Sequence, residues 1–211
     1  MEIIVLFAFL IMNYLMLIAK RMTALIRTFR LQSLFLGIGT LLSAPREGHP
    51  DLYAVALLIV GLKVILIPRF LFNIVQRVKV NDNLGMFVNP QLSIVFGLVF
   101  TYAAWIFSLS IVPLQEPLQT VSLTAAFTGT LCGAFLMMFR MKALTQVIGL
   151  LVMENGIFLL AASITGGMPF FVEIAIFFDV FVSVIILNVF MQRINRMFTH
   201  IDVHKLTHLR G

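Results

Sequence analysis

Charged residues inside long apolar runs are the residues of this chain that could do chemistry. Lys63 and Glu154 each lie near the middle of an apolar run, and Asp179 and Glu173 lie in a third run. An ionisable side chain at mid-bilayer costs about 3 kcal/mol or more, so it marks a functional site by default. Burial favours a protonated carboxyl group and a nearby cation favours the ionised one. We therefore take Glu154, Asp179, Lys63 and Glu173 as candidates for proton transfer, with Lys63 as the opposite charge.

The spacing of the acids predicts that two of them lie at one depth. Glu154 and Asp179 are the same number of residues away from the Gly166–Gly167 pair, on either side of it. A helix rises about 1.5 Å per residue, so we expect both carboxylates about 18 Å from this turn. Glu173 is expected about 9 Å nearer to the turn, towards the membrane surface.

Three arginines lie in apolar runs close to their expected cytoplasmic ends. Arg27 and Arg30 follow the start of one run, and Arg69 follows Pro68 near the end of the next. An arginine near a helix end extends its long side chain to the membrane interface, and a proline bends the helix that contains it. We take the three as charge partners or interface contacts at the cytoplasmic side.

Long apolar helices must position these residues. Of the 211 residues, 61% are hydrophobic and 11% charged, whereas soluble domains are about half apolar and about a quarter charged. A bilayer core needs about 20 residues of helix, and only helices or closed barrels satisfy their backbone in hydrocarbon. The sequence therefore predicts an all-α integral membrane protein with about seven transmembrane helices. These are expected at residues 3–19, 23–43, 52–75, 91–112, 120–139, 143–164 and 169–191.

Charges between the runs predict the orientation. Every second connection and the tail are basic, and the other connections carry three acids with one arginine, or no charge. Basic segments stay on the cytoplasmic side, so we expect the N-terminus outside and the C-terminus inside. Glu2 precedes the first run and Lys20 and Arg21 follow it, which is the reverse of a signal peptide. No extramembrane domain and no internal repeat is expected.

Small residues on one run predict a close helix contact. Ala125, Gly129 and Gly133 recur every four residues and therefore share one helix face. Such stripes let two membrane helices approach each other closely.

Several function classes have no support in the sequence. The chain has no zincin, serine-hydrolase, phosphate-loop or dinucleotide motif, so no catalytic residue is assigned. A single cysteine, Cys132, excludes an intramolecular disulfide and a cysteine-ligated iron–sulfur cluster on this chain alone. The net charge of +6 is scattered rather than clustered, unlike a nucleic-acid surface. His200, His204 and His208 have the spacing of a metal clip, but no fourth ligand is evident and no metal site is predicted.

Four segments resemble the hydrogenase-4 component E family. They are residues 147–156 (VIGLLVMENG) with Glu173 and Asp179 after them, the ending IDVHKLTHLRG, residues 63–68 (KVILIP) and residues 30–34 (RLQSL). The resemblance covers most of the chain, and MENG and the final Arg-Gly are its most specific parts.

The C-terminal part is in turn similar to the three-helix K subunit of respiratory complex I. The resemblance implies two parts: a four-helix membrane extension over residues 1–115 and a K-like module with a short cytoplasmic tail over residues 116–211. The K subunit has a glutamate at the position of Leu151, and here the acid is three residues later, at Glu154, on the same helix face. The second K-type glutamate aligns with Asp179.

This resemblance implies a non-catalytic subunit of a group 4 [NiFe] hydrogenase of the formate-hydrogenlyase kind, in a prokaryotic cytoplasmic (inner) membrane. Its implied partners are antiporter-like membrane subunits and the hydrogenase large and small subunits, which would carry the [NiFe] centre and the iron–sulfur clusters. The chain would help couple electron transfer to proton or sodium movement. Two alternatives remain: an autonomous ion-coupled carrier, and a structural brace whose charges pair statically.

Overall fold

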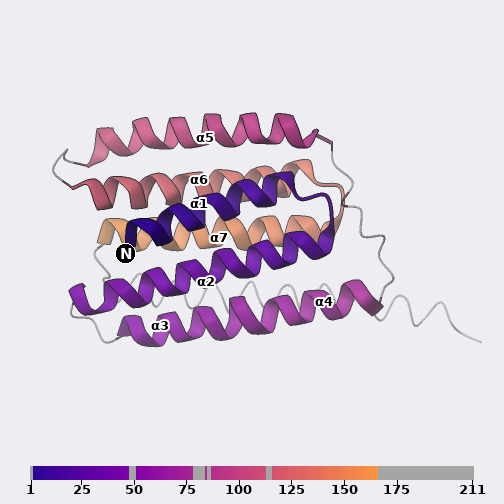
Figure 1. Ribbon diagram of the computed structural model, residues 1–211, viewed down its shortest axis with the longest axis horizontal. Helices are drawn as coiled ribbons and strands as arrows, with labels where there is room; N and C mark the ends of the chain where they lie inside the picture. The colour runs from indigo at the N-terminus through magenta and orange to yellow at the C-terminus, as the bar shows by residue number, and fades with distance from the viewer. Residues whose placement is uncertain (1, 48–50, 78–83, 85–86, 113–115, 166–211) are drawn as a thin grey trace, which may run out of the picture. The chain divides into compact units, whose positions relative to one another are not determined.

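A computed structural model describes residues 2–47, 51–77, 84, 87–112 and 116–165, and these residues are almost entirely helical (Figure 1). The helices, in chain order, are α1 (Glu2–Ile18), α2 (Met22–Glu47), α3 (Asp51–Ile59), the π-helix η1 (Val60–Leu66), α4 (Ile67–Arg77), α5 (Pro90–Ile111), α6 (Pro117–Phe139) and α7 (Ala143–Thr165). The segment α3–η1–α4 is one continuous helical rod.

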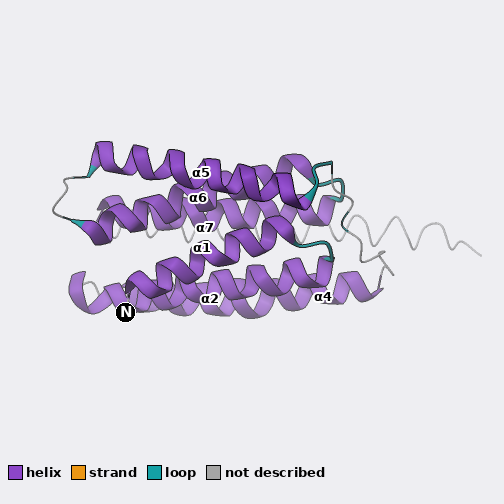
Figure 2. Cartoon of the chain, turned by 45° about the horizontal axis from the view of Figure 1, so that its top comes forward, coloured by secondary structure: helices purple, strands orange, loops and turns teal. Residues whose placement is uncertain are grey.

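The helices run roughly side by side along one direction (Figures 1 and 2). α6 packs against α1, α5 and α7, and α2 packs against α1, α7 and the α3–η1–α4 rod. The rod and α5 therefore form opposite edges, with α1, α2, α6 and α7 between them. Of the most apolar stretch of each helix, 56% is buried in α6 and 17% in α5. The low buried share of α5 agrees with its place at an edge.

The membrane-protein prediction is confirmed for five helices. α2, the α3–η1–α4 rod, α5, α6 and α7 are long and apolar enough to cross a bilayer. The first apolar run forms α1, which is a shorter apolar helix of 17 residues. The run 169–191 lies outside the described residues, so seven spans, the orientation of the termini and the division at residue 115 stay predictions.

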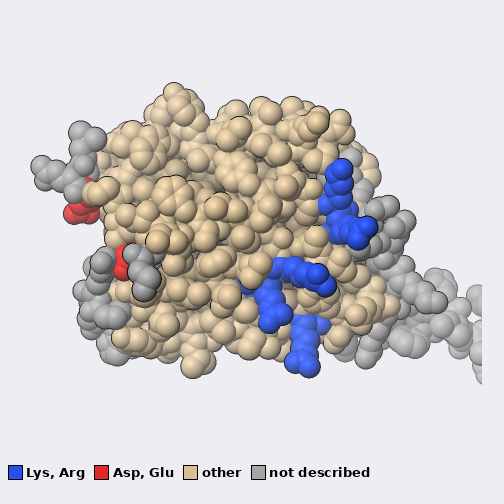
Figure 3. All heavy atoms as spheres, viewed as in Figure 1, with Lys and Arg blue, Asp and Glu red and all other residues tan. Residues whose placement is uncertain are grey.

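Charged side chains gather at opposite ends of the visible face. Figure 3 shows lysine and arginine towards one end and acidic side chains at the other end, with apolar and neutral residues between them. Glu2 begins α1 and Glu116 is the N-cap of α6, and both therefore lie at the acidic end. This distribution is what the positive-inside rule expects of a chain that crosses a bilayer.

Within the rod, the π-helical segment η1 ends two residues before Pro68. In this turn the Ile67 N–H donates to the carbonyl of Leu62, five residues earlier. Pro68 has no N–H for the carbonyl of Val64, and its ring would crowd that carbonyl in a regular helix. The wider turn therefore accommodates the proline, and it sets the direction of Lys63, which lies inside it. Such π segments occur frequently at functional sites.

The predicted close contact between helices is confirmed, and its partner is α7. A β-carbon added to Gly133 would overlap the backbone nitrogen of Met153 and would lie 2.8 Å from the Gly149 carbonyl oxygen. A β-carbon on Gly149 would lie 2.6 Å from the backbone nitrogen of Met137. The backbones of α6 and α7 therefore touch where both helices have glycine, and this contact fixes the face that α7 turns to the other helices.

Candidate functional site

The structure brings Lys63 and Glu154 together between the helices. Lys63, in η1, is 1% exposed, and Glu154, in the middle of α7, is 4% exposed. The Lys63 Nζ atom lies 3.4 Å from the Glu154 Oε1 atom. Opposite charges stabilise each other strongly at this range because the interior screens them far less than water does. The pair can therefore keep one charged lysine and one carboxyl group away from solvent.

Lys63 has a second, closer partner on the same helix as Glu154. Its Nζ atom donates a hydrogen bond of 2.9 Å to the Oδ1 atom of Asn155. Asn155 is fully buried and follows Glu154 directly in the chain. Lys63 therefore has a buried neutral acceptor in addition to the Glu154 carboxyl group.

A chain of hydrogen bonds links Asn155 to two further helices. Asn155 Nδ2 donates to Gln32 Oε1 at 3.1 Å and to Ser33 Oγ at 3.0 Å, both on α2. Gln32 Nε2 donates to Asn13 Oδ1 at 2.8 Å, and Asn13 Nδ2 donates to the Phe9 carbonyl at 3.0 Å on α1. Asn13, Gln32 and Ser33 are fully buried. Four helical segments, α1, α2, η1 and α7, thus meet at one polar chain.

Sequence reasoning missed the amide residues of this chain. Asn13 is the one amide of the apolar helix α1. Gln32 is followed directly by Ser33 in α2, and Asn155 adjoins Glu154. A signal was present, because an amide inside a membrane span is costly unless it finds a buried partner. These amides carry no formal charge, so they are less conspicuous in a membrane span than Lys63 and Glu154.

The three arginines lie apart from this buried group. Arg27, Arg30 and Arg69 are all exposed, on α2 and α4. Lys63, by contrast, is buried, although it belongs to the same rod as Arg69. The structure does not bring them into contact with the Lys63–Glu154 pair, and their role at an interface stays a prediction.

Other predicted site residues lie outside the described part of the chain. These are Glu173, Asp179 and the histidines His200, His204 and His208. In the described part, no group of three or more metal-ligating side chains converges. That Glu154 and Asp179 lie at the same depth in the membrane stays a prediction.

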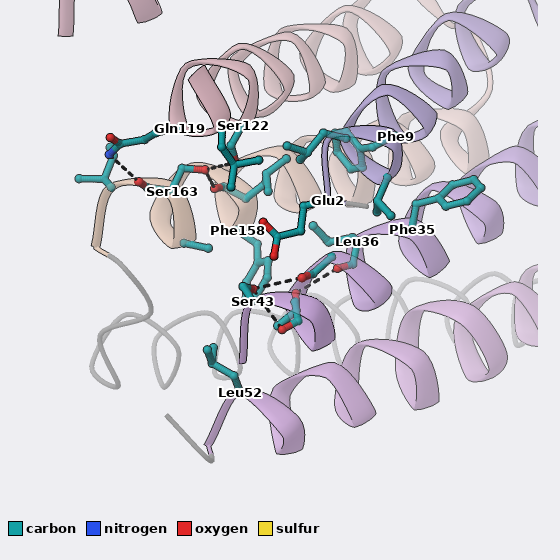
Figure 4. A pocket seen from close by; sticks show the side chains of 18 of the residues that line it. Glu2, Phe9, Phe35, Leu36, Ser43, Leu52, Gln119, Ser122, Phe158 and Ser163 are labelled. Atoms are coloured by element: carbon teal, nitrogen blue, oxygen red, sulfur yellow. Dashed lines mark hydrogen bonds between the residues drawn. The ribbon is translucent and has the colours of Figure 1, made fainter. Parts of the chain in front are cut away.

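A cavity of about 700 Å³ lies at the acidic end of the molecule, between α1, α2, α6 and α7 (Figure 4). Apolar side chains dominate its walls, among them Phe9, Leu36 and Phe158. Its polar lining includes Ser163, whose hydroxyl bonds Ser122 and whose carbonyl accepts from Gln119. Phe9 also supplies the carbonyl at the far end of the amide chain, so the cavity adjoins that chain.

Arg140 is a buried charge with a structural role at the basic end. It follows α6 as its C-cap and is 3% exposed. Its Nη2 atom donates to the carbonyls of Met16 at 3.3 Å and Leu17 at 2.8 Å, in the last turn of α1. A cation there satisfies carbonyls that the helix leaves unbonded and complements the helix dipole. Burial lowers the pKa of Arg140 to about 10, which leaves the guanidinium charged at neutral pH.

Substituting Arg140 is expected to destabilise the attachment of α1 to α6. We expect Arg140→Met to lower the free energy of unfolding by about 2 kcal/mol, because two charge-assisted hydrogen bonds are lost. Thermal unfolding of the full chain in detergent measures this loss. Arg21→Met, which removes an exposed charge at the same end, is the control and should change stability by about 0.5 kcal/mol or less. Equal losses in both variants would contradict the capping role.

Comparison with known proteins finds relatives along most of the chain. No protein-family model and no solved structure matches it. It is 28% identical to "Uncharacterized protein Rv0085" of Mycobacterium tuberculosis over 192 residues, covering 90% of this chain and 87% of that protein. It is 26% identical to Hydrogenase-4 component E of Escherichia coli K12 over 153 residues, covering 71% of this chain and 69% of that protein, and Hydrogenase-4 component E of Shigella flexneri matches equally. The chain is thus a helical membrane protein distantly related to Hydrogenase-4 component E.

Proposed function

We propose that this chain is a membrane-arm subunit of an energy-converting group 4 [NiFe] hydrogenase complex. In that complex it helps couple electron transfer to the movement of protons or sodium ions. The observation that carries the proposal is the enclosed Lys63–Glu154 pair, with 3.4 Å between Nζ and Oε1, in a distant relative of Hydrogenase-4 component E. Charged groups within a membrane span are costly, and they are kept where an ion pathway needs them.

Glu154 is the central proton-carrying group of this proposal. Lys63 lies 3.4 Å from its carboxylate and donates a hydrogen bond to Asn155. In this proposal Lys63 favours the ionised form of Glu154, and Asn155 continues to accept from Lys63 when Glu154 is protonated. Asp179 and Glu173 are the further proton sites, in keeping with the resemblance to the complex I K subunit. A change in the Lys63–Glu154 separation alters how strongly Glu154 holds its proton, and this dependence is how a conformational change could drive ion movement.

The redox chemistry belongs to other subunits in this proposal. The chain has one cysteine, Cys132, which is buried in α6. The [NiFe] centre and the iron–sulfur clusters would be held by the hydrogenase large and small subunits, and antiporter-like subunits would adjoin this chain in the membrane. Arg27, Arg30 and Arg69 are exposed and available for contacts at the basic side.

Copurification tests the assignment to a complex. We expect the tagged full chain, extracted in mild detergent, to bring down hydrogenase large and small subunits in amounts stoichiometric with itself. Mass spectrometry of the purified material identifies and quantifies them. A chain that purifies alone and moves an ion-coupled substrate in liposomes would instead be an autonomous carrier, and the proposal would be wrong.

A further inference from the structure

The three buried amides form a chain of hydrogen bonds that runs in one direction. Lys63 donates to Asn155, Asn155 donates to Gln32, Gln32 donates to Asn13, and Asn13 donates to the carbonyl of Phe9. The two ends force this direction. An ammonium group can only donate, so Asn155 must turn its oxygen to Lys63, and a backbone carbonyl can only accept, so Asn13 must turn its NH₂ group to Phe9.

The direction of the chain has an electrostatic consequence. Each amide places its oxygen, the negative end of its dipole, on the side nearer to Lys63. Hydrogen bonds aligned head to tail polarise one another, and their effect is large where the surroundings screen weakly. The amides therefore stabilise a positive charge on Lys63 independently of the charge on Glu154.

In the part of the chain that the structure describes, the other charged residues on the neighbouring helices are exposed or stand at helix ends. The elements that pack against η1 and α7 are α2, α3, α4 and α6. α6 contains no Asp, Glu, Lys, Arg or His, and Arg27, Arg30 and Arg69 on α2 and α4 are exposed. The remaining charged residues on these elements, at the ends of α2, α3 and α4, are Arg46, Glu47, Asp51 and Arg77. In the described part of the chain, the Glu154 carboxylate lies 3.4 Å from Lys63 Nζ, and Glu173 and Asp179 lie outside that part.

We propose that Asn13, Gln32 and Asn155 hold the proton on Lys63, so that Glu154 is the member of the pair that takes up and releases a proton. In this scheme the carboxylate of Glu154 gains one proton to become a carboxylic acid, and Lys63 remains an ammonium throughout. Asn13 and Gln32 are then positioning residues that act through Asn155. The inference rests on the proposed role of Glu154 in ion movement and assigns which partner exchanges the proton.

Exchanging the side-chain lengths at positions 13 and 32 tests the positioning role of Asn13 and Gln32. Gln32→Asn shortens the link between Asn13 and Asn155 by one methylene, and Asn13→Gln/Gln32→Asn restores the summed length. The measurement is the infrared carbonyl-stretch band of a protonated carboxyl group, recorded as a function of pH on the full chain in lipid vesicles. The band that disappears in Glu154→Gln is assigned to Glu154. Gln119→Asn, in a partly buried hydrogen bond to the Ser163 carbonyl that is separate from these amides, is the matched control.

We expect the Glu154 band to extend to higher pH in Gln32→Asn, because a less stabilised Lys63 passes its proton to Glu154. The swapped double variant should return the band to its wild-type pH dependence, and Gln119→Asn should not change it. If Gln32→Asn does not fold, Asn13→Ser breaks the same chain at its far end and should extend the band likewise. An unchanged band in the variant that folds would overturn the inference.

The same variants separate this inference from the proposed function. If the band responds as expected but Glu154→Gln leaves ion movement by the complex intact, the amide chain acts as inferred and the proposed ion pathway is wrong. If Glu154→Gln abolishes ion movement but the band of Gln32→Asn is unshifted, the pathway stands and the role of the amides is wrong.

Discussion

Replacing Glu154 with glutamine is expected to reduce ion movement by the assembled complex to background while its hydrogenase reaction continues. Glutamine has nearly the same shape as glutamic acid and still offers an oxygen to Lys63, but it cannot carry a proton. The substitution therefore removes the proposed chemistry of the site with little change in its volume. Removal of both proposed mid-membrane acids, in Glu154→Gln/Asp179→Asn, should give the same complete loss.

Inverted membrane vesicles measure this effect. Hydrogen evolution with an artificial electron donor reports the redox reaction, and a pH-sensitive or sodium-sensitive dye reports the ions moved. Glu116→Gln is the matched control, because it removes an exposed carboxylate at the N-cap of α6 and should leave the ratio of ions to hydrogen unchanged. Wild-type ion movement in the Glu154 and Asp179 double variant would show that these acids are not proton sites.

Replacing Gly133 with alanine is expected to be among the most damaging small substitutions in the described helices. Its new methyl group would overlap the backbone of Met153 and crowd the Gly149 carbonyl. A backbone cannot move aside as a side chain can, so α6 and α7 must separate. Overpacking of this kind costs about 1–3 kcal/mol, and it would also displace Glu154, which lies next to Met153.

Gly39→Ala, in α2, is the matched control, and it is expected to leave stability unchanged or to raise it. A β-carbon at Gly39 would lie 3.7 Å from a Val5 side-chain atom, which is ordinary contact. Alanine also favours a helix over glycine by about 1 kcal/mol. Thermal unfolding in detergent should therefore show a lower midpoint for Gly133→Ala and an equal or higher midpoint for Gly39→Ala. A midpoint for Gly133→Ala at or above that of the wild type would contradict the close contact between α6 and α7.

The sequence predicted the helices well because the bilayer imposes strong constraints on them. Five predicted runs coincide with long apolar helices to within a few residues at most ends. α6 begins at Pro117, earlier than residue 120, because proline suits the first turn of a helix. The π-helical turn was not predicted, although Pro68 was recognised as a source of bending.

The site was only partly predictable from sequence. Lys63 and Glu154 were identified because formal charge in an apolar run is conspicuous, and Lys63 was expected to be the opposite charge. Their geometry depends on the π turn at Lys63 and on the glycine contact that orients α7. The face of each helix that turns inward was also hidden, because the lipid-facing side of a membrane helix is as apolar as its buried side.

The ion-site account differs from a structural brace in what it requires of the Lys63–Glu154 pair. A buried ion pair replaced on both sides by apolar residues of similar volume often leaves stability unchanged or raised. A brace would therefore tolerate such a replacement, whereas an ion site would lose its function. The side chains of Lys63 and Glu154 are both unbranched, and methionine approximates the volume of each.

The ratio of ions moved to hydrogen evolved, measured for Lys63→Met/Glu154→Met per assembled complex in vesicles, tests this difference most directly. The account predicts a complex that still assembles and evolves hydrogen but moves ions only at background level. A ratio equal to that of the wild type would show that the pair holds helices together and carries no ion.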